Sequence, residues 1–478
     1  MNQSLKKYIL LLMLTATFTS CKKWLDVKPE DKFVESQLYS NPQGFADAMN
    51  GFYINNSSNA MYGATLTCTT LDVLAQLYLV KSENSGYYSM STYSYGQDGP
   101  KATIDGIWTN MYANIANANR FLSSLDKYPN VLDAKTGDLY RGEVLGLRAM
   151  YYFDIMRMFT KAYPTDALSK VLPYYQTASY EISDFMPTSY VMDKILEDLK
   201  NAETLLQKSD PAISQPMVSQ LTTTNSGRTS RNYRMNYYAV KALQARVNLW
   251  KGDKAAALAA AKVLIAQQDK FPWITQADLN GIPCNKIFAT EMIFGVEKTD
   301  LNNLFSSNFA AQLFDTQILA PIATGAFTDI TVFEGYPADY RNQYIWRVNG
   351  RPFPTFFKYF NEGGLSYNSN NTIPLIKMSE MHLIAAECEP DEAAGLEHLN
   401  LLRVKRNISA LPAGTNGPNL ADAIMKEYRK EFYGEGQLFF YYKRTMQNSI
   451  ISGGTNLSMG MSAANYTFPI PLSETTPR

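Results

Sequence analysis

The sequence predicts a mainly α fold, in which a tetratricopeptide-like helical-repeat superhelix is interrupted by a loop-rich, irregular ligand-binding insertion. Three observations lead to this fold. Apolar residues recur at helical spacing over most of the chain. Two helical segments and a tight turn near the middle together span about 34 residues, the spacing of a tetratricopeptide repeat. Over residues 268–373 the helical stripes vanish while Gly, Pro, Asn and aromatic residues increase, and binding loops collect in such segments.

The chain begins with a pattern typical of a secretory signal peptide. Two lysines precede the apolar stretch 8–14, and small residues lead to Cys21. This predicts a lipoprotein signal over residues 1–20, lipidation of Cys21 and a polar tether over residues 21–35. The alternative is an ordinary signal followed by an ordinary cysteine. A transmembrane anchor is excluded, because spanning a bilayer takes about 20 apolar residues.

Composition argues against nucleic acid and anionic membrane surfaces as partners. Lys plus Arg and Asp plus Glu each count 44 in the 478 residues, so the chain carries no net electrostatic attraction to a polyanion. The length suits two or three domains or one large repeat array. We expect no cofactor.

The helical body is expected over residues 36–267 and 374–478, and the insertion over 268–373. In order, the predicted helices cover 36–53, 70–80, a stretch around 107–122, 137–159 and 190–206. Gly, Ser and Pro between residues 81 and 100 argue against a regular element there. Residues 207–232 are rich in Ser, Thr and Gln and are predicted to form a loop.

The clearest repeat unit joins helices 235–250 and 254–266 through a turn at Gly252. The sequence predicts that a stripe on the first helix faces a stripe on the second, and small alanines allow a close approach. The first stripe is Ala239, Ala242, Ala245 and Leu249, and the second is Ala256, Ala259, Ala260 and Val263. Further units are expected over 376–406 and, turning at Gly434, over 421–444. The helices between 137 and 206 form the earliest pair.

The cysteines and histidines give weak signals. Cys388 lies in an apolar helical stretch and is predicted to be a buried small hydrophobe. Cys68 and Cys284 could pair, but spacing does not decide this. His382 and His398, the only two histidines, lie on successive helices and could meet in space. Their spacing is not that of a metal motif, so we expect no metal site.

No phosphate-binding loop, nucleophile elbow or dinucleotide motif occurs in the sequence. Glu427 and Glu431 share one helix face, but basic residues surround them, which predicts an ion-paired surface helix. A hydrolase with two carboxylates leaves no local sequence signature, so this class stays open as an alternative.

Aromatic residues provide the candidate binding site. The chain has 32 Tyr and 24 Phe, and rings beside amide and charged groups suit sugars, whose C–H faces stack and whose hydroxyls need partners. Packing inside a loop-rich domain is the alternative. The candidate ligand residues are Tyr87, Tyr88, Tyr93, Tyr95, Asn84, Gln97 and Asp98 near the 81–100 loop, and Tyr336, Tyr340, Arg341 and Trp346 in the insertion, where Asp339 and Asn342 are further polar partners.

Several motifs, taken together and in order, resemble the SusD/RagB family of Bacteroidetes outer-membrane lipoproteins over nearly the whole chain. They are Trp24-Leu25-Asp26 after Cys21, Asn50-Gly51-Phe52-Tyr53, the Trp108 to Asn119 helix, Arg148-Ala149-Met150-Tyr151-Tyr152-Phe153-Asp154, the turn Gly252-Asp253, the Lys377 to Glu387 helix, and Pro469-Ile470-Pro471 with Glu474. After its last repeat helix the family often has Glu-Gly-x-Arg-Trp-x-Asp-Leu. Here Glu435-Gly436-Gln437-Leu438 departs from that pattern, so a starch specificity does not carry over.

The resemblance implies a surface-exposed lipoprotein, anchored in the cell outer membrane through Cys21. Such a protein captures oligosaccharides and delivers them, as a lid, to a SusC-like TonB-dependent transporter, and it is not an enzyme. The resemblance further implies that the repeat helices pack on the transporter while the irregular half holds the ligand, with the aromatic loop before the Trp108 helix as a platform. Peptide capture in the same role, a surface glycoside hydrolase and a protein-binding scaffold are the alternatives.

Overall fold

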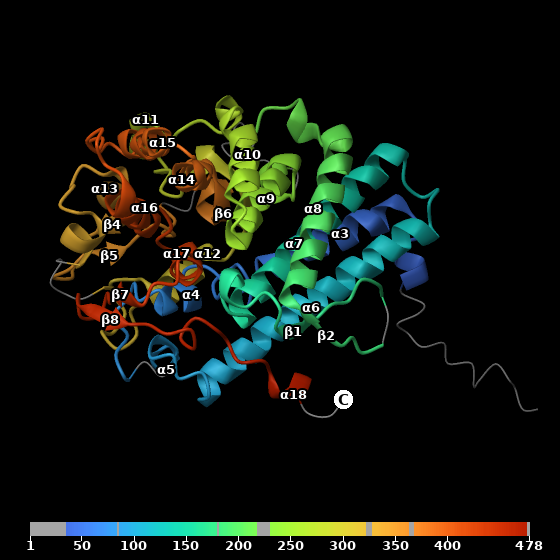
Figure 1. Ribbon diagram of the computed structural model, residues 1–478, viewed down its shortest axis with the longest axis horizontal. Coiled ribbons are helices and arrows are strands. Elements are labelled where there is room, and N and C mark those ends of the chain that lie inside the picture. Colours follow the sequence, from blue (N-terminus) through green and yellow to red (C-terminus); the bar gives the residue numbers. More distant parts are fainter. Residues whose placement is uncertain are drawn as a thin grey trace, which may run out of the picture.

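The computed structural model describes residues 35–83, 86–178, 181–217, 230–321, 327–362 and 368–475. The predicted signal peptide, Cys21 and almost all of the predicted tether therefore lie outside the described residues. Among those described, no helix is long and apolar enough to cross a membrane. Figure 1 shows helices over most of the molecule and only short strands between and beside them, so the predicted mainly α fold is confirmed.

The first helices differ in extent from the predicted ranges, and the predicted helix around 107–122 is present within a longer one. They are α3 (Pro42–Asn56), α4 (Thr70–Leu74), α5 (Tyr88–Ser91) and α6 (Asp98–Lys127). The prediction for 70–80 was wrong after residue 74, because Gln76 takes a left-handed backbone with φ 59° and the chain turns away. The prediction of no regular element over 81–100 was also wrong, since α5 and the start of α6 lie there.

Helices α7 (Ala134–Phe159) and α8 (Thr188–Ser209) pack on each other, as predicted, and α6 packs on α7 as well. Asp133 caps α7 by accepting a hydrogen bond from the amide of Thr136. Gly142 allows the close approach, since a Cβ there would lie 2.7 Å from Cγ of Leu206. The hairpin β1 (Lys170–Pro173) and β2 (Phe185–Pro187) connects the two helices.

The predicted repeat unit is present as α9 (Tyr237–Lys251) and α10 (Lys254–Ile265). Gly252 ends α9 with φ 91°, in the left-handed region that favours glycine. The predicted inner stripe of α9 is confirmed, because all four of its residues are buried. On α10 only Ala260 was right; Val263 is 37% exposed. The stripe is rotated because α10 also packs on α14, and it consists of Ala257, Leu258, Ala260, Ala261 and Leu264.

The C-terminal units are α14 (Met378–Cys388) with α15 (Glu392–Lys405), and α16 (Gly417–Glu431) with α17 (Gln437–Arg444). The turn between α16 and α17 lies at Gly434 to Gly436, as predicted, and both glycines have positive φ. The last elements are the hairpin β7 (Ser449–Ile451) and β8 (Ser458–Gly460) and the short α18 (Leu472–Thr475).

The predicted insertion contains short elements and one buried strand pair. Its helices are α11 (Gln276–Asn280), α12 (Leu301–Asn308) and α13 (Tyr340–Ile345), with a π-helical turn at Phe327–Val332. Strand β3 (Met292–Glu297) pairs antiparallel with β6 (Thr372–Lys377), and β4 (Trp346–Arg347) pairs with β5 (Thr355–Phe356). Because β6 runs directly into α14, the β3–β6 pair joins the insertion to the repeat helices.

Buried charges join the same parts of the molecule. The prediction that Glu427 and Glu431 lie on a surface helix was wrong, because both side chains are fully buried. They are nevertheless ion-paired, Glu427 with Arg403 at 2.8 Å and Glu431 with Arg406 at 2.8 Å. Burial alone would raise the pKa of Glu427, but Arg341 and Lys430 outweigh it and lower the value to about 2. The spacing of charged residues along α16 shows that they share one helix face. It does not show that this face is buried against the insertion.

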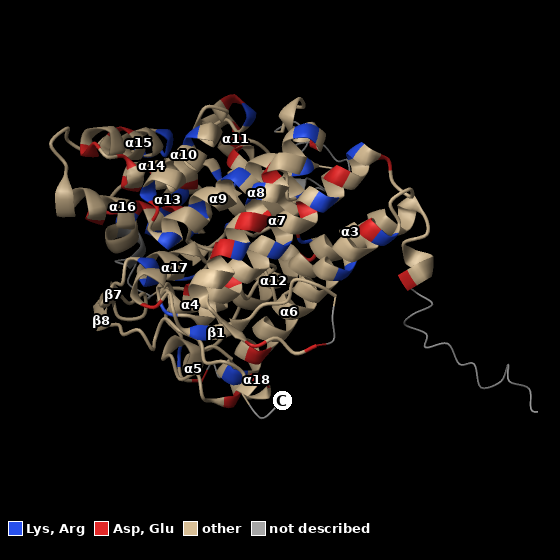
Figure 2. Ribbon diagram, turned by 45° about the vertical axis from the view of Figure 1, so that its right-hand side comes forward, with Lys and Arg blue, Asp and Glu red and all other residues tan. Residues whose placement is uncertain are grey.

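The cysteines that the structure describes are all buried and free. Cys68 and Cys284 therefore do not pair, and Cys388 is buried as predicted. Figure 2 shows Lys and Arg interspersed with Asp and Glu along the helices, which agrees with the equal numbers of the two signs.

Candidate functional site

The tyrosines of the 81–100 loop mostly anchor the loop to the body. The Tyr93 hydroxyl donates to the carbonyl of Leu74 at 2.6 Å, and the Tyr87 hydroxyl donates to Oδ1 of Asn308 at 3.2 Å. Tyr95 donates to the carbonyl of Asn465, and its ring packs edge-on against Phe468. Tyr88 differs from these three, since it is 38% exposed. Of the four predicted platform rings, Tyr88 therefore presents the most accessible face.

The polar candidates near this loop are on the surface or outside the described part of the chain. Gln97 and Asp98 are exposed at the start of α6. Asn84 lies outside the described residues.

The candidates in the insertion are more deeply placed. Arg341 is buried and ion-paired with Asp339 at 2.7 Å, and Trp346 is buried with its ring edge-on to Tyr433. Tyr336 is half-buried under the guanidinium of Arg403, 5.4 Å from the ring centre.

The ring of Tyr340 packs against that of Tyr344, with 6.1 Å between ring centres. The role of these insertion residues and of the 81–100 tyrosines in binding a ligand stays a prediction.

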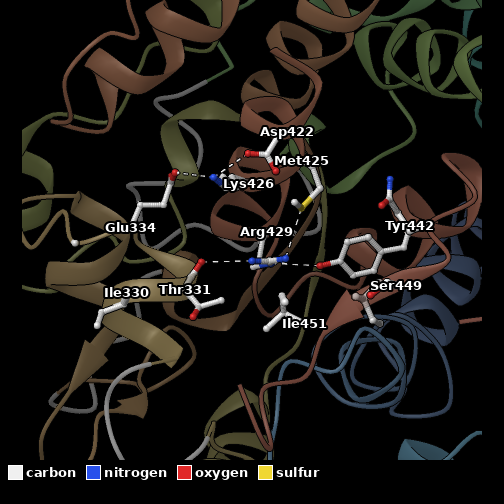
Figure 3. Close-up of a pocket in the computed structure, with 13 residues that line it drawn as sticks. Ile330, Thr331, Glu334, Asp422, Met425, Lys426, Arg429, Tyr442, Ser449 and Ile451 are labelled. Atoms are coloured by element: carbon white, nitrogen blue, oxygen red, sulfur yellow. Dashed lines mark hydrogen bonds and ion pairs between the residues drawn. The ribbon is translucent and has the colours of Figure 1, made fainter. Parts of the chain in front are cut away.

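A cavity of about 600 Å³ opens between the insertion and the last repeat helices (Figure 3). The π-helical turn contributes Ile330 and Thr331, α17 contributes Tyr442, and β7 contributes Ser449 to Ile451. Helix α16 forms one wall with Asp422, Met425, Lys426 and Arg429, which lie on one helix face because they follow the spacing of three and four residues. None of the predicted ligand residues lines this cavity.

The charges in the cavity are balanced and paired. Lys426 contacts Asp422 at 2.8 Å and Glu334 at 3.6 Å, and the hydrogen bond to Asp422 raises the pKa of Lys426. Glu334 also pairs with Lys430 at 2.5 Å. The lining itself carries two acidic side chains, Asp422 and Glu334, and two basic ones, Lys426 and Arg429, so its formal charge is zero and selects neither an anionic nor a cationic ligand.

Arg429 lies at the centre of the cavity, between Thr331 and Tyr442 (Figure 3). Its guanidinium donates to the Thr331 carbonyl and to the Tyr442 hydroxyl, both at 3.3 Å, and contacts the sulfur of Met425 at 3.5 Å. A guanidinium has five N–H donors, and these contacts are long for hydrogen bonds to oxygen. Arg429 is only 4% exposed but lines the cavity, so its guanidinium can donate to hydroxyl or carbonyl oxygens of a ligand that enters there.

The cavity adjoins the 81–100 loop through the C-terminal hairpin. The Tyr466 hydroxyl donates to the carbonyl of Gln447, a cavity residue, at 2.9 Å. The amide of Gly453 donates to the carbonyl of Gln76, whose side chain holds the loop by donating to the Ser91 carbonyl at 2.7 Å. Residues far apart in sequence thus build one side of the molecule.

Sequence reasoning missed the cavity, although one signal for it exists. The polar stripe of Asp422, Lys426 and Arg429 is visible as helical spacing. Its position opposite the π-helical turn and β7 depends on the tertiary fold.

The two histidines meet as predicted, with 3.4 Å between their Nδ1 atoms. Burial is the main cause that lowers the pKa of His382, to about 3, and the nearby charge of His398 lowers it further. Across the described ranges, no group of three or more His, Cys, Asp and Glu side chains is arranged to hold a metal ion.

Comparison with known proteins identifies the fold and the family. The family model described as "Starch-binding associating with outer membrane" matches residues 23–224, and the model of the SusD family matches residues 314–475. No curated protein sequence is significantly similar to the chain.

Solved structures of SusD superfamily proteins share the fold at low sequence identity. One from Bacteroides thetaiotaomicron is 19% identical with a TM-score of 0.72, and the match covers 91% of this chain and 97% of that one. One from Bacteroides fragilis is also 19% identical, with a TM-score of 0.71 and coverage of 92% and 98%. A laminarin-binding SusD-like protein is 18% identical, with a TM-score of 0.63 and coverage of 91% and 97%. Together, the two family matches and the shared fold show that this chain belongs to the SusD/RagB family.

Proposed function

We propose that this protein is a cell-surface glycan-binding lipoprotein, lipid-anchored at Cys21, that hands oligosaccharides to a TonB-dependent outer-membrane transporter. Family membership supports this role, since one matching family model is described as starch-binding and a structure with the same fold is of a laminarin-binding protein. The single structural observation that carries the proposal is the balanced, hydrogen-bonding cavity around Arg429.

The chemistry of the cavity suits a neutral sugar better than an ion. Its two acidic and two basic lining side chains offer donors and acceptors without a net charge. Ile330 and Ile451 supply apolar surface against which the C–H face of a sugar ring can pack. Tyr88, exposed on the neighbouring loop, is the further contact expected for a longer chain.

The same geometry favours binding over hydrolysis. A glycosidase of the usual kind needs a carboxylic acid that is protonated before the reaction and a second carboxylate beside it. In this cavity the carboxyl groups of Asp422 and Glu334 both contact the same ammonium group, that of Lys426, so neither stands free to face a glycosidic bond. We therefore infer that the protein captures its ligand without cleaving it.

Calorimetric titration of the unlipidated chain, residues 22–478, with neutral oligosaccharides such as maltoheptaose and laminarihexaose tests the proposal. Arg429→Met removes the central donor, and we expect about a tenfold or greater loss of affinity, the effect of losing about 1.4 kcal/mol or more. Arg141→Met is the matched control, because Arg141 lies outside the cavity and pairs only with Asp126 among the described residues.

Unchanged affinity of a correctly folded Arg429→Met variant would place the ligand elsewhere. Binding of a peptide library instead of the sugars would support the peptide alternative. Release of reducing ends from the sugars by the purified protein would contradict the non-catalytic role.

A further inference from the structure

A second and larger cavity lies away from the Arg429 cavity. It is a groove of about 1020 Å³ between α3, the part of α6 from Trp108 to Lys127, and the segments 173–178 and 181–182. Figure 1 shows α3 well separated from α16 and β7, which border the Arg429 cavity. Neither the sequence motifs nor the proposed function uses this groove.

The groove has an aromatic floor and wall. Trp108 and Tyr112 of α6 pack with 4.7 Å between ring centres, and Tyr175 meets Tyr112 edge-on at 6.0 Å. Trp108 is buried, whereas Tyr112 and Tyr175 are partly exposed. Two ring faces at a right angle therefore border the groove.

The wall that carries Tyr175 is held rigidly from behind. The backbone amide of Tyr175 donates to the hydroxyl of Tyr152 at 2.7 Å. The backbone carbonyl of Tyr175 accepts from the same hydroxyl and from the side-chain amide of the buried Asn119. The side chain of Asn119 is itself fixed, because its Oδ1 accepts from Arg148 at 2.7 Å. The backbone that positions the ring is thus set before any ligand arrives, which lowers the entropic cost of binding.

The rim of the groove is polar and of mixed charge. Asn117, Arg120 and Lys127 are exposed on one face of α6. Glu35 lies opposite and contacts Lys127 at 3.9 Å, and Glu181 and Glu474 also border the groove. An anionic ligand would meet these carboxylates and a cationic ligand the two basic groups, so the rim favours a neutral ligand rich in hydrogen-bonding groups.

We infer that this groove is a second glycan-binding site, which takes a neutral oligosaccharide chain with a sugar ring stacked on Tyr175 and hydroxyl groups along the α6 rim. The inference rests on the proposed function for the class of ligand. Two separated sites on one molecule give a long glycan higher apparent affinity than either site alone, provided that one chain spans both.

Titration of the unlipidated chain with a short oligosaccharide tests the second site by its stoichiometry. The wild type is expected to bind two molecules of the oligosaccharide. Tyr175→Ala is expected to keep the molecule in the Arg429 cavity, and Arg429→Met is expected to keep the molecule in the groove. Loss of the stacked ring is expected to weaken groove binding by about tenfold. Tyr190→Ala is the matched control, because Tyr190 is an exposed tyrosine on α8 that borders neither cavity.

The possible results separate the two claims. One bound molecule that Arg429→Met abolishes and Tyr175→Ala leaves unchanged overturns the second site and leaves the proposed function intact. Binding of a peptide in the groove in competition with the sugar overturns the ligand class. A wild type that binds no oligosaccharide contradicts the proposed function and, with it, this inference.

Discussion

Arg341→Met tests whether this arginine stabilises the fold or binds a ligand. The side chain is fully buried and contacts Asp339 at 2.7 Å, Glu427 at 2.9 Å and Glu431 at 3.1 Å. Methionine keeps an unbranched apolar stem and removes the charge. Glu427 and Glu431 retain other basic partners in the variant. Among the described residues, Asp339 forms an ion pair only with Arg341.

The expected loss follows from leaving a buried carboxylate without its partner. Breaking a buried ion pair from one side costs about 3–5 kcal/mol. The unfolding entropy of about 2.1 cal/mol/K per residue, over 478 residues, amounts to about 1 kcal/mol per degree. We therefore expect the melting temperature to fall by about 3–5 °C.

Urea denaturation followed by circular dichroism measures the free energy of unfolding, and sugar titration below the transition measures affinity. Arg347→Met is the matched control, because Arg347 is 42% exposed and makes a partly exposed ion pair with Glu362 at 2.6 Å, and exposed pairs contribute about 0–1 kcal/mol. If Arg341→Met keeps wild-type stability but loses sugar binding, the structural reading of Arg341 is wrong and its predicted role as a ligand residue is right.

Three further predictions concern turns, burial and pH. Burial raises the pKa of Asp72 from 3.8 to about 8 despite hydrogen bonds from the amides of Gly434 and Gly436, so the folded state holds a proton that the unfolded state releases. The stabilisation from the protonated Asp72 is complete below pH 3.8 and is lost as pH rises toward 8. Asp72→Asn should remove this pH dependence of the unfolding free energy, which is up to about 1.4 kcal/mol per pH unit. If the urea midpoint of Asp72→Asn varied with pH as that of the wild type does, this prediction would be contradicted. Gly436→Ala should cost more than about 2 kcal/mol, since a Cβ would lie 2.6 Å from the Leu66 carbonyl oxygen, whereas Gly252→Ala, with open space at a similar φ, should cost about 1 kcal/mol; equal losses in urea melts would count against the steric argument. Leu264→Asp should prevent folding, whereas Val263→Asp should change stability by less than about 0.5 kcal/mol. A larger loss of melting temperature for Val263→Asp than for Leu264→Asp would support the inner stripe of α10 that was predicted from sequence.

Predictions from local patterns were the most accurate. Helix α7 was predicted at 137–159 and found at Ala134–Phe159, because its apolar stripe and its cap are encoded within the helix. The turn at Gly252 was predicted for the same reason, since a left-handed residue ends the helix regardless of what packs on it.

Predictions that depended on a distant neighbour were less accurate. The face of α10 was displaced because α14, more than 100 residues later in the chain, also packs on it. The acidic face of α16 was placed on the surface because its buried partners, Arg341 and Arg406, come from other segments.

The sequence by itself determined the repeat architecture, the family resemblance and the expectation of a lipid anchor, because helical periodicity and motif order are local properties of the chain. Only the tertiary structure decided where a ligand has room. Three of the four loop tyrosines use their hydroxyls to hold the fold, while the Arg429 cavity and the Tyr175 groove are lined by segments that meet only after folding. A cavity is a property of surfaces brought together from distant parts of the chain, and no short stretch of sequence carries that information.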